Sequence, residues 1–223
     1  MVALALASLA VLAGSRAGLL HEMMTGQQAD QQRAQAMAEA LALDAEADIQ
    51  GRPGNAPCRP SAIAPQQSAP GFIGCRERGT GPFPAAPYFP RSVAEFEEVR
   101  ALLQVGAAIP CRDGICAPSS LHALSVLGEA PQAAQALGAR YGQFTQATQP
   151  AGSLSAQAGQ RAWVWVEIFR LQTGAATPTA QTARPGAVRP FVYRITAVAE
   201  GMRPGTRAVV KTLFVPETGG APP

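Results

Sequence analysis

The stretch Gln27–Ile49, QQADQQRAQAMAEALALDAEADI, contains no proline or glycine and is rich in alanine, glutamine, leucine and glutamate. Such a composition favours a helix, because most of these side chains lose little freedom on entering one. Apolar residues recur at steps of three and four and form one thin stripe: Ala34, Met37, Ala38, Leu41, Ala45 and Ile49. Polar residues are expected mostly on the other faces: Asp30, Arg33, Glu39 and Asp44. The stretch predicts an amphipathic helix that ends at Gly51, Pro53 and Gly54 and lies on its own globular region.

The residues before this helix, Val2–Leu20, read VALALASLAVLAGSRAGLL, and their only charge is Arg16. This length is about what is needed to cross a bilayer core of roughly 30 Å, and an arginine near the end can snorkel to the interface. We expect these residues to form the membrane or filament half of the helix: Val2, Leu4, Leu6, Leu9, Val11, Leu12, Gly14, Gly18, Leu19 and Leu20. A continuous helix from Val2 to Ile49 would be on the order of 70 Å long. Because the uninterrupted apolar core is only Val2–Ala13, a cleaved signal peptide stays open as an alternative.

Four cysteines, Cys58, Cys75, Cys111 and Cys116, follow this export-like segment, which favours disulfides in an oxidising compartment. Of the three possible pairings we favour Cys58–Cys75 with Cys111–Cys116, since both close short loops. A zinc site is the rival interpretation, but the spacings differ from those of common structural zinc sites. The net charge of +3, with 15% charged residues, is not the strongly basic composition expected of a protein that binds nucleic acid.

The middle of the chain is expected to be irregular, with short helices. Residues 51–90 are rich in proline and glycine and predict a loop held by a disulfide. Ser92 and Glu95 form a capping box, which predicts a helix over Val93–Gln104. A second, weaker helical pattern runs through Gln132–Phe144.

The last third predicts strands. Arg161–Leu171, RAWVWVEIFRL, has apolar residues on both faces, which is typical of a central or well-covered strand. Pro190–Glu200 and Arg207–Val215 flank a turn at Gly201–Gly205 and predict an antiparallel hairpin joined to that strand. The fold class is therefore α+β. We divide the chain into an N-terminal helix, residues 1–50 (2–20 apolar, 21–49 amphipathic), and a head, residues 51–223, with loops and short helices over 51–160 and an antiparallel sheet over 161–216.

No motif for a catalytic, cofactor or metal site stands out. Gly152–Ala156 fails the nucleophile pattern G-x-S-x-G at its last position, and His122 near Ser119 and Ser120 is most simply a lone surface histidine. Trp163 and Trp165 are expected to pack in the core rather than to bind a sugar. We expect no enzyme activity, no cofactor, no metal, no nucleic-acid partner and no small-molecule substrate.

Three segments resemble the PilX family of minor pilins. In Leu20–Glu46, the features are Glu22, Met24, Thr25-Gly26 and the A-E-A core at residues 38–40. Tyr193–Val215, YRITAVAEGMRPGTRAVVKTLFV, looks like the family's closing hairpin, and Cys111–Pro118, CRDGICAP, is similar to its C-x-x-G-x-C element. The resemblance implies a pilin fold with disulfide-tied loops and a position in the bacterial inner membrane with the head in the periplasm, then in an extracellular pilus. It also implies contacts with other minor and major pilins in filament initiation or assembly, with adhesion or aggregation as a further role.

Two alternatives stay open at this point. A minor pseudopilin of a type II secretion system has the same architecture, and an exported hydrolase or binding protein with a cleaved signal peptide belongs to another class. Pilins carry a basic leader ending in glycine before the apolar helix, whereas Met1 lies inside that helix here. Either the true start site lies upstream of Met1 or the sequence was trimmed at this end, and no processing residue is assigned.

Overall fold

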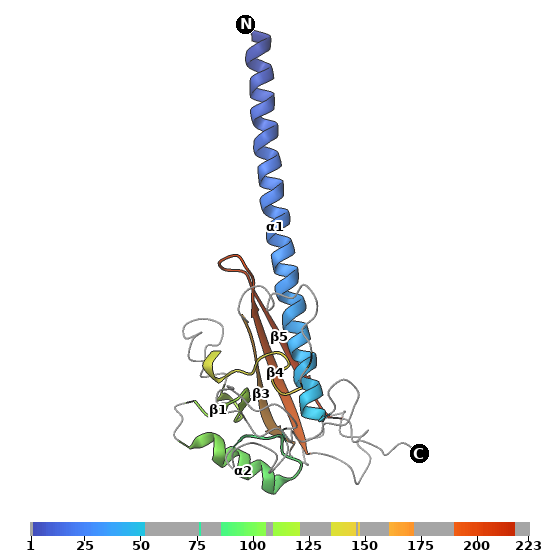
Figure 1. Ribbon diagram of the computed structural model, residues 1–223, viewed down its shortest axis with the longest axis vertical. Coiled ribbons are helices and arrows are strands. Elements are labelled where there is room, and N and C mark those ends of the chain that lie inside the picture. Colours follow the sequence, from blue (N-terminus) through green and yellow to red (C-terminus); the bar gives the residue numbers. More distant parts are fainter. Residues whose placement is uncertain are drawn as a thin grey trace, which may run out of the picture.

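A computed structural model shows one long helix packed on a five-stranded sheet (Figure 1). It describes residues 2–51, 76, 86–105, 109–120, 135–145, 147, 161–171 and 190–216, with side chains from residue 21 onward. The helices are α1 (Val2–Gln50) and α2 (Val93–Gln104). The strands are β1 (Cys111–Arg112), β2 (Ile115–Cys116), β3 (Ala162–Arg170), β4 (Phe191–Glu200) and β5 (Arg207–Phe214). The predicted α+β class is confirmed.

The sheet has the order β1-β2-β3-β4-β5, and all neighbouring pairs are antiparallel except β2 and β3, which are parallel. The predicted hairpin is present, with Glu200 opposite Arg207 next to the turn and Tyr193 opposite Phe214 at the far end. β3 is central, as its double-sided apolar pattern predicted. The short β1–β2 hairpin extends the sheet beyond it.

α1 packs its C-terminal half across β3, β4 and β5, and its N-terminal half projects beyond the head (Figure 1). The predicted stripe is confirmed, since all six of its residues are buried: Ala34, Met37, Ala38, Leu41, Ala45 and Ile49. These side chains meet the face of the sheet that carries Val164, Ile195 and Ala197. Three of the six stripe residues are alanine, whose small side chain lets the helix lie close to the sheet.

The opposite face of the sheet has its own small core. Trp163 and Trp165 lie there with Val198 and the cysteines Cys111 and Cys116. Both tryptophans are at most 5% exposed, so they are core residues, as expected.

α2 begins at the predicted cap. The Ser92 hydroxyl accepts a hydrogen bond from the Glu95 N–H at 3.3 Å, and the Glu95 carboxylate accepts one from the Arg91 N–H at 2.7 Å. The first bond satisfies an N–H group that the helix start leaves without a helical partner, and the second ties the residue before the cap to the first turn. Phe96 on the buried face of α2 then stacks on Phe191 of β4, with ring centroids 5.5 Å apart.

The predicted helix over Gln132–Phe144 is wrong from residue 138 onward. Residues 135–137 form a single helical turn, after which Ala139 bonds with both its N–H and its carbonyl to Val164, at 2.9 and 3.0 Å. This antiparallel bridge needs extended backbone, so the chain leaves the helix. Gly138 lets the backbone of this segment pass close to β3, because a Cβ at residue 138 would lie only 3.0 Å from the Trp165 ring.

Several expectations fall outside the described residues. They concern Cys58, Cys75, His122, the Gly152–Ala156 segment and the side chains of Val2–Leu20, for which only the helical backbone is described. Among the residues whose side chains are described, no helix has an apolar stretch long enough to cross a membrane.

Candidate functional site

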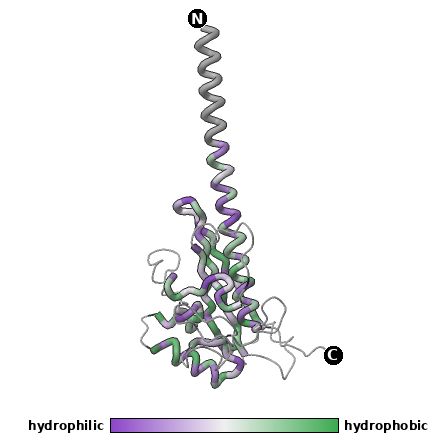
Figure 2. The backbone as a smooth tube through the Cα atoms, viewed as in Figure 1, coloured by the Kyte–Doolittle hydropathy of each residue, from purple (hydrophilic) through white to green (hydrophobic). Residues whose placement is uncertain are grey.

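Between its apolar segment and the head, α1 has a stretch in which nearly all described side chains are exposed. We call residues 21–29 the neck. Met23 and Met24 are 63% and 62% exposed, and Gln27 and Gln28 are also exposed. From Met23 to Gln28 the neck carries no charged residue. Figure 2 shows this segment between the head and the N-terminal end of the helix.

Three aspartates of α1 bind the head. The first is Asp30, which is only 3% exposed although the sequence placed it away from the stripe; that expectation is wrong. Its carboxylate accepts hydrogen bonds from the backbone N–H groups of Met202 and Arg203, at 2.9 and 3.0 Å. Those bonds, with the Arg203 N–H contributing most, lower the pKa of Asp30 below its ordinary value. These hydrogen bonds outweigh the desolvation of the carboxylate, which acts in the opposite direction.

The second aspartate, Asp44, holds the loop at residues 140–145. It accepts a hydrogen bond from the Gly142 N–H at 2.8 Å and another from the Thr145 hydroxyl. Gly142 has φ +68°, and a Cβ there would lie 2.3 Å from the carbonyl oxygen of Ala147, so the turn needs glycine. Burial is the main cause of a raised pKa for Asp44.

The third aspartate, Asp48, forms a buried ion pair with Arg76. The Arg76 Nε donates to the Asp48 carboxylate at 2.8 Å, and Nη2 donates to the same oxygen. The two side chains are 3% and 7% exposed for Arg76 and Asp48. Desolvation raises the pKa of Asp48 and the Arg76 cation opposes that shift. Because a buried carboxylate is costly without a partner, this pair fixes residue 76 against the end of α1.

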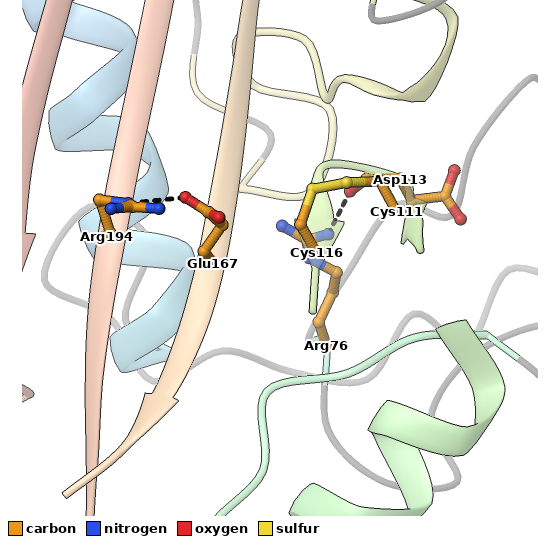
Figure 3. Close-up of a disulfide and its surroundings, with 6 residues drawn as sticks. All are labelled: Arg76, Cys111, Asp113, Cys116, Glu167 and Arg194. Carbon is orange, nitrogen blue, oxygen red and sulfur yellow. Dashed lines mark hydrogen bonds and ion pairs between the residues drawn. A yellow bond between two sulfur atoms is a disulfide. The ribbon is translucent and has the colours of Figure 1, made fainter. Parts of the chain in front are cut away.

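Arg76 also joins this ion pair to the disulfide hairpin. Its Nη1 donates to the carbonyl oxygen of Asp113 at 2.6 Å, as Figure 3 shows. The guanidinium lies over two rings, 3.7 Å from the Phe144 centroid and 4.7 Å from that of Phe89. One side chain therefore connects α1, the β1–β2 turn and two loops.

The β1–β2 hairpin is closed by the Cys111–Cys116 disulfide, one of the two pairings that the sequence favours. Its turn residues Asp113 and Gly114 both have positive φ, +50° and +76°, which suits a two-residue hairpin with an Asp-Gly turn. Gly114 also donates to the Leu137 carbonyl at 2.8 Å and accepts from the Val166 N–H at 2.7 Å. The hairpin is thereby bonded on both sides.

A second ion pair, between a buried glutamate and a partly exposed arginine, joins β3 and β4 on the face away from α1. Glu167 is fully buried, and its carboxylate accepts a hydrogen bond from the Arg194 Nε at 2.7 Å (Figure 3). This bond raises the pKa of Arg194. Glu167 lies opposite Cys116 in the β2–β3 register, so the pair adjoins the disulfide.

The structure brings together residues that the sequence did not single out. Asp30 and Asp48 follow the same spacing as the apolar stripe, four residues before Ala34 and three after Ala45, and that spacing would have found them. Arg76 has no comparable local signal. In the described part of the chain, no group of three or more histidine, cysteine, aspartate or glutamate side chains is arranged to hold a metal ion. The arrangement binds segments of the chain to one another, while most side chains of the neck stay exposed.

A comparison with protein families gives one match: the model described as type IV pilus assembly protein PilX, C-terminal, matches residues 75–216. The matched range is more than half of the chain and contains both the disulfide hairpin and the closing β4–β5 hairpin. No curated protein and no solved structure matches the chain.

Proposed function

The chain belongs to the PilX family of type IV pilus assembly proteins, and from that premise we propose that it is a minor pilin that takes part in initiating or assembling the filament. The family is a structural, non-enzymatic part of the pilus with a periplasmic or surface-exposed location. We infer the same for this chain, with no catalytic role. The division into an N-terminal helix, residues 1–50, and a head, residues 51–223, is part of the proposal.

The observation that carries the proposal is the exposed neck, which has no charged residue from Met23 to Gln28, on a helix that extends beyond its head. Interface centres between proteins are depleted in lysine, glutamate and aspartate, and methionine is enriched there. Met23, Met24, Gln27 and Gln28 fit that composition. A shallow hollow lined by Met24, Gln27, Gln28 and Gln31 gives room for a side chain of a neighbouring subunit. We assign this surface to contacts with other minor and major pilins.

We further propose that residues Val2–Leu20 hold the protein in the inner membrane before assembly and pack among sister helices in the filament. Their apolar composition and length support this role. A part in cell adhesion or aggregation would follow from surface display of the head, and comparison of aggregation by wild-type and deletion strains tests it.

The proposal is tested by deleting the gene and restoring it with matched variants. Gln28→Lys places a charge on the neck, and Gln104→Lys makes the same change at the exposed end of α2. Wild type and Gln104→Lys should restore surface pili and twitching motility. Gln28→Lys should restore neither fully while its protein level stays normal, since burying an unpaired charge at a contact is unfavourable.

Other outcomes would support the alternatives. Normal pili in the deletion strain together with a secretion defect would point to a type II pseudopilin. Loss of the first twenty or so residues from the mature protein, measured by mass spectrometry, would remove the membrane segment and favour an exported protein with a cleaved signal peptide.

A further inference from the structure

The β4–β5 turn, residues Gly201–Thr206, lies beside α1 at the end of the sheet from which the helix projects (Figure 1). We call this turn the collar. Within it the Thr206 N–H donates to the Arg203 carbonyl at 3.1 Å, and Gly205 has φ +87° after Pro204. A proline followed by a residue with positive φ is typical of a type II turn. The collar thus has a defined shape of its own.

The backbone of the collar faces Asp30. The Gly201 N–H donates to the Thr206 carbonyl at 2.8 Å, while the next two N–H groups, of Met202 and Arg203, both donate to the Asp30 carboxylate. Gly201 allows this approach, because a Cβ there would lie 2.4 Å from Oδ2 of Asp30. A charged acceptor that receives two backbone donors is a strong and directional contact.

The Arg203 side chain adds a second contact between about one and two helical turns nearer the N-terminus. Its Nη1 donates to the Met23 carbonyl at 3.3 Å, and its guanidinium passes over Gly26. A Cβ at residue 26 would lie 2.3 Å from Nη2 of Arg203. The Gln31 amide also donates to the Arg207 carbonyl, at 3.3 Å, on the strand that leaves the collar.

These contacts lie where the buried part of α1 ends. Residues 34, 37 and 38 are buried against the sheet, whereas residues 21–25 are all exposed. The stripe packs closely on the sheet, and Asp44 and Asp48 hold the C-terminal end of the helix on the head. At the N-terminal end of the packed segment, Asp30 and Arg203 add contacts that oppose rotation and sliding of the helix. Hydrogen bonds with defined geometry resist both.

We propose that the collar is a positioning element, in which Asp30 and Arg203 set the direction in which α1 leaves the head. Asp30 holds two successive N–H groups of the turn, and Arg203 braces the helix at Met23 and Gly26. The neck is thereby presented at a fixed angle to the head. The consequence for subunit packing rests on the proposed function, whereas the positioning role does not.

The test measures the angle directly, on the full chain in detergent. Nitroxide labels on non-canonical residues at the exposed positions Glu22 and Arg100 report the neck-to-head distance by pulsed electron resonance. The wild type should give a narrow distance distribution. Asp30→Ala and Arg203→Ala should lose it and give a broad one, while Gln32→Ala, an exposed position of the same helix, should keep the narrow distribution.

Hydrogen exchange provides an independent readout. The Met202 and Arg203 amides should exchange at least about tenfold faster in Asp30→Ala, because each loses a charge-assisted hydrogen bond. Amides in the centre of β4 should be unchanged. If Asp30→Ala does not fold, Arg203→Ala decides the question, since it leaves the bonds to Asp30 in place. A narrow, unshifted distribution in a folded Arg203→Ala variant, or in a folded Asp30→Ala variant, would overturn the proposal.

Pilus assembly separates this inference from the proposed function. A broad distribution with defective pili supports both. A broad distribution with normal pili supports the positioning role and counts against the idea that neck contacts drive assembly.

Discussion

Replacing Arg76 by methionine should destabilise the head more than any surface change, because it leaves Asp48 as a buried charge without its partner. Methionine keeps most of the length of the arginine stem and can contact Phe89 and Phe144 through its sulfur. The substitution therefore removes the ion pair with Asp48 and the bond to the Asp113 carbonyl with little loss of volume.

The magnitude follows from the burial of the pair. With side chains 3% and 7% exposed, removing one partner is expected to cost about 3–5 kcal/mol. The loss of two cation–π contacts is partly offset by the new sulfur–aromatic contacts, each on the order of 1 kcal/mol. We expect Arg76→Met to lower the free energy of unfolding by about 4 kcal/mol, a large part of the stability of a typical domain.

The double variant Arg76→Met with Asp48→Leu removes both charges and should recover most of that loss, because apolar replacements of a buried pair are often nearly neutral. The control is Arg100→Met. Arg100 pairs with Glu97 on the surface, with side chains 51% and 45% exposed, so its loss should cost about 0–0.5 kcal/mol.

Equilibrium unfolding of the full chain in mild detergent measures these differences. The two tryptophans of the chain, Trp163 and Trp165, are both buried in the head, so their fluorescence reports its unfolding. The reasoning is refuted if Arg76→Met costs no more than Arg100→Met, or if the double variant is no more stable than Arg76→Met alone.

The remaining predictions use the same unfolding measurement. Replacing Cys111 and Cys116 by serine should cost about 2 kcal/mol, since the bond closes only a short loop. Gly114→Ala should cost about 2 kcal/mol or more, because residue 114 has φ +76° and the new Cβ would lie 2.6 Å from the Cβ of Ala139. Asp30→Asn should be less stable than wild type at neutral pH. That difference should shrink as the pH falls below the ordinary aspartate pKa of 3.8, because the native pKa is lowered and protonation then removes the advantage of the charged form.

Each of these has a contradicting outcome. A reduced wild type as stable as the oxidised one would show that the disulfide contributes nothing to the hairpin. A Gly114→Ala variant with wild-type stability would mean that the turn relaxes without loss. A constant difference between Asp30→Asn and wild type from pH 7 to pH 3 would show that the Asp30 charge is not what the collar binds.

Much of the architecture could be read from local patterns. The stripe from Ala34 to Ile49, the cap at Ser92 and the alternation in Phe191, Tyr193 and Ile195 each report a period that matches one kind of secondary structure. The Pro204-Gly205 pair similarly marks its turn. These signals are properties of neighbouring residues, and the chain needs no distant contact to express them.

The wrong predictions for Ala139 and Asp30 have a common cause. In both, contacts with residues distant in sequence override the conformation or exposure that the neighbouring residues favour. Ala139 lies in a helix-favouring segment, yet its bonds to Val164 hold it extended. Asp30 is a polar residue on a helix and was expected away from the buried stripe. It is buried because its carboxylate binds N–H groups of a turn more than 170 residues away in the sequence.

The sequence by itself determined a long helix with an amphipathic half, an antiparallel hairpin beside a covered strand and the resemblance to the PilX family, and it favoured the Cys111–Cys116 pairing, since each rests on spacing within a short stretch. Only the tertiary structure decided how the head is held on the helix. The pairs Asp48–Arg76 and Glu167–Arg194 and the contact of Asp30 with the collar depend on which groups folding brings together and on how far it removes each carboxylate from water. A charge that is ordinary on a solvated helix becomes a specific contact only when folding buries it beside a donor.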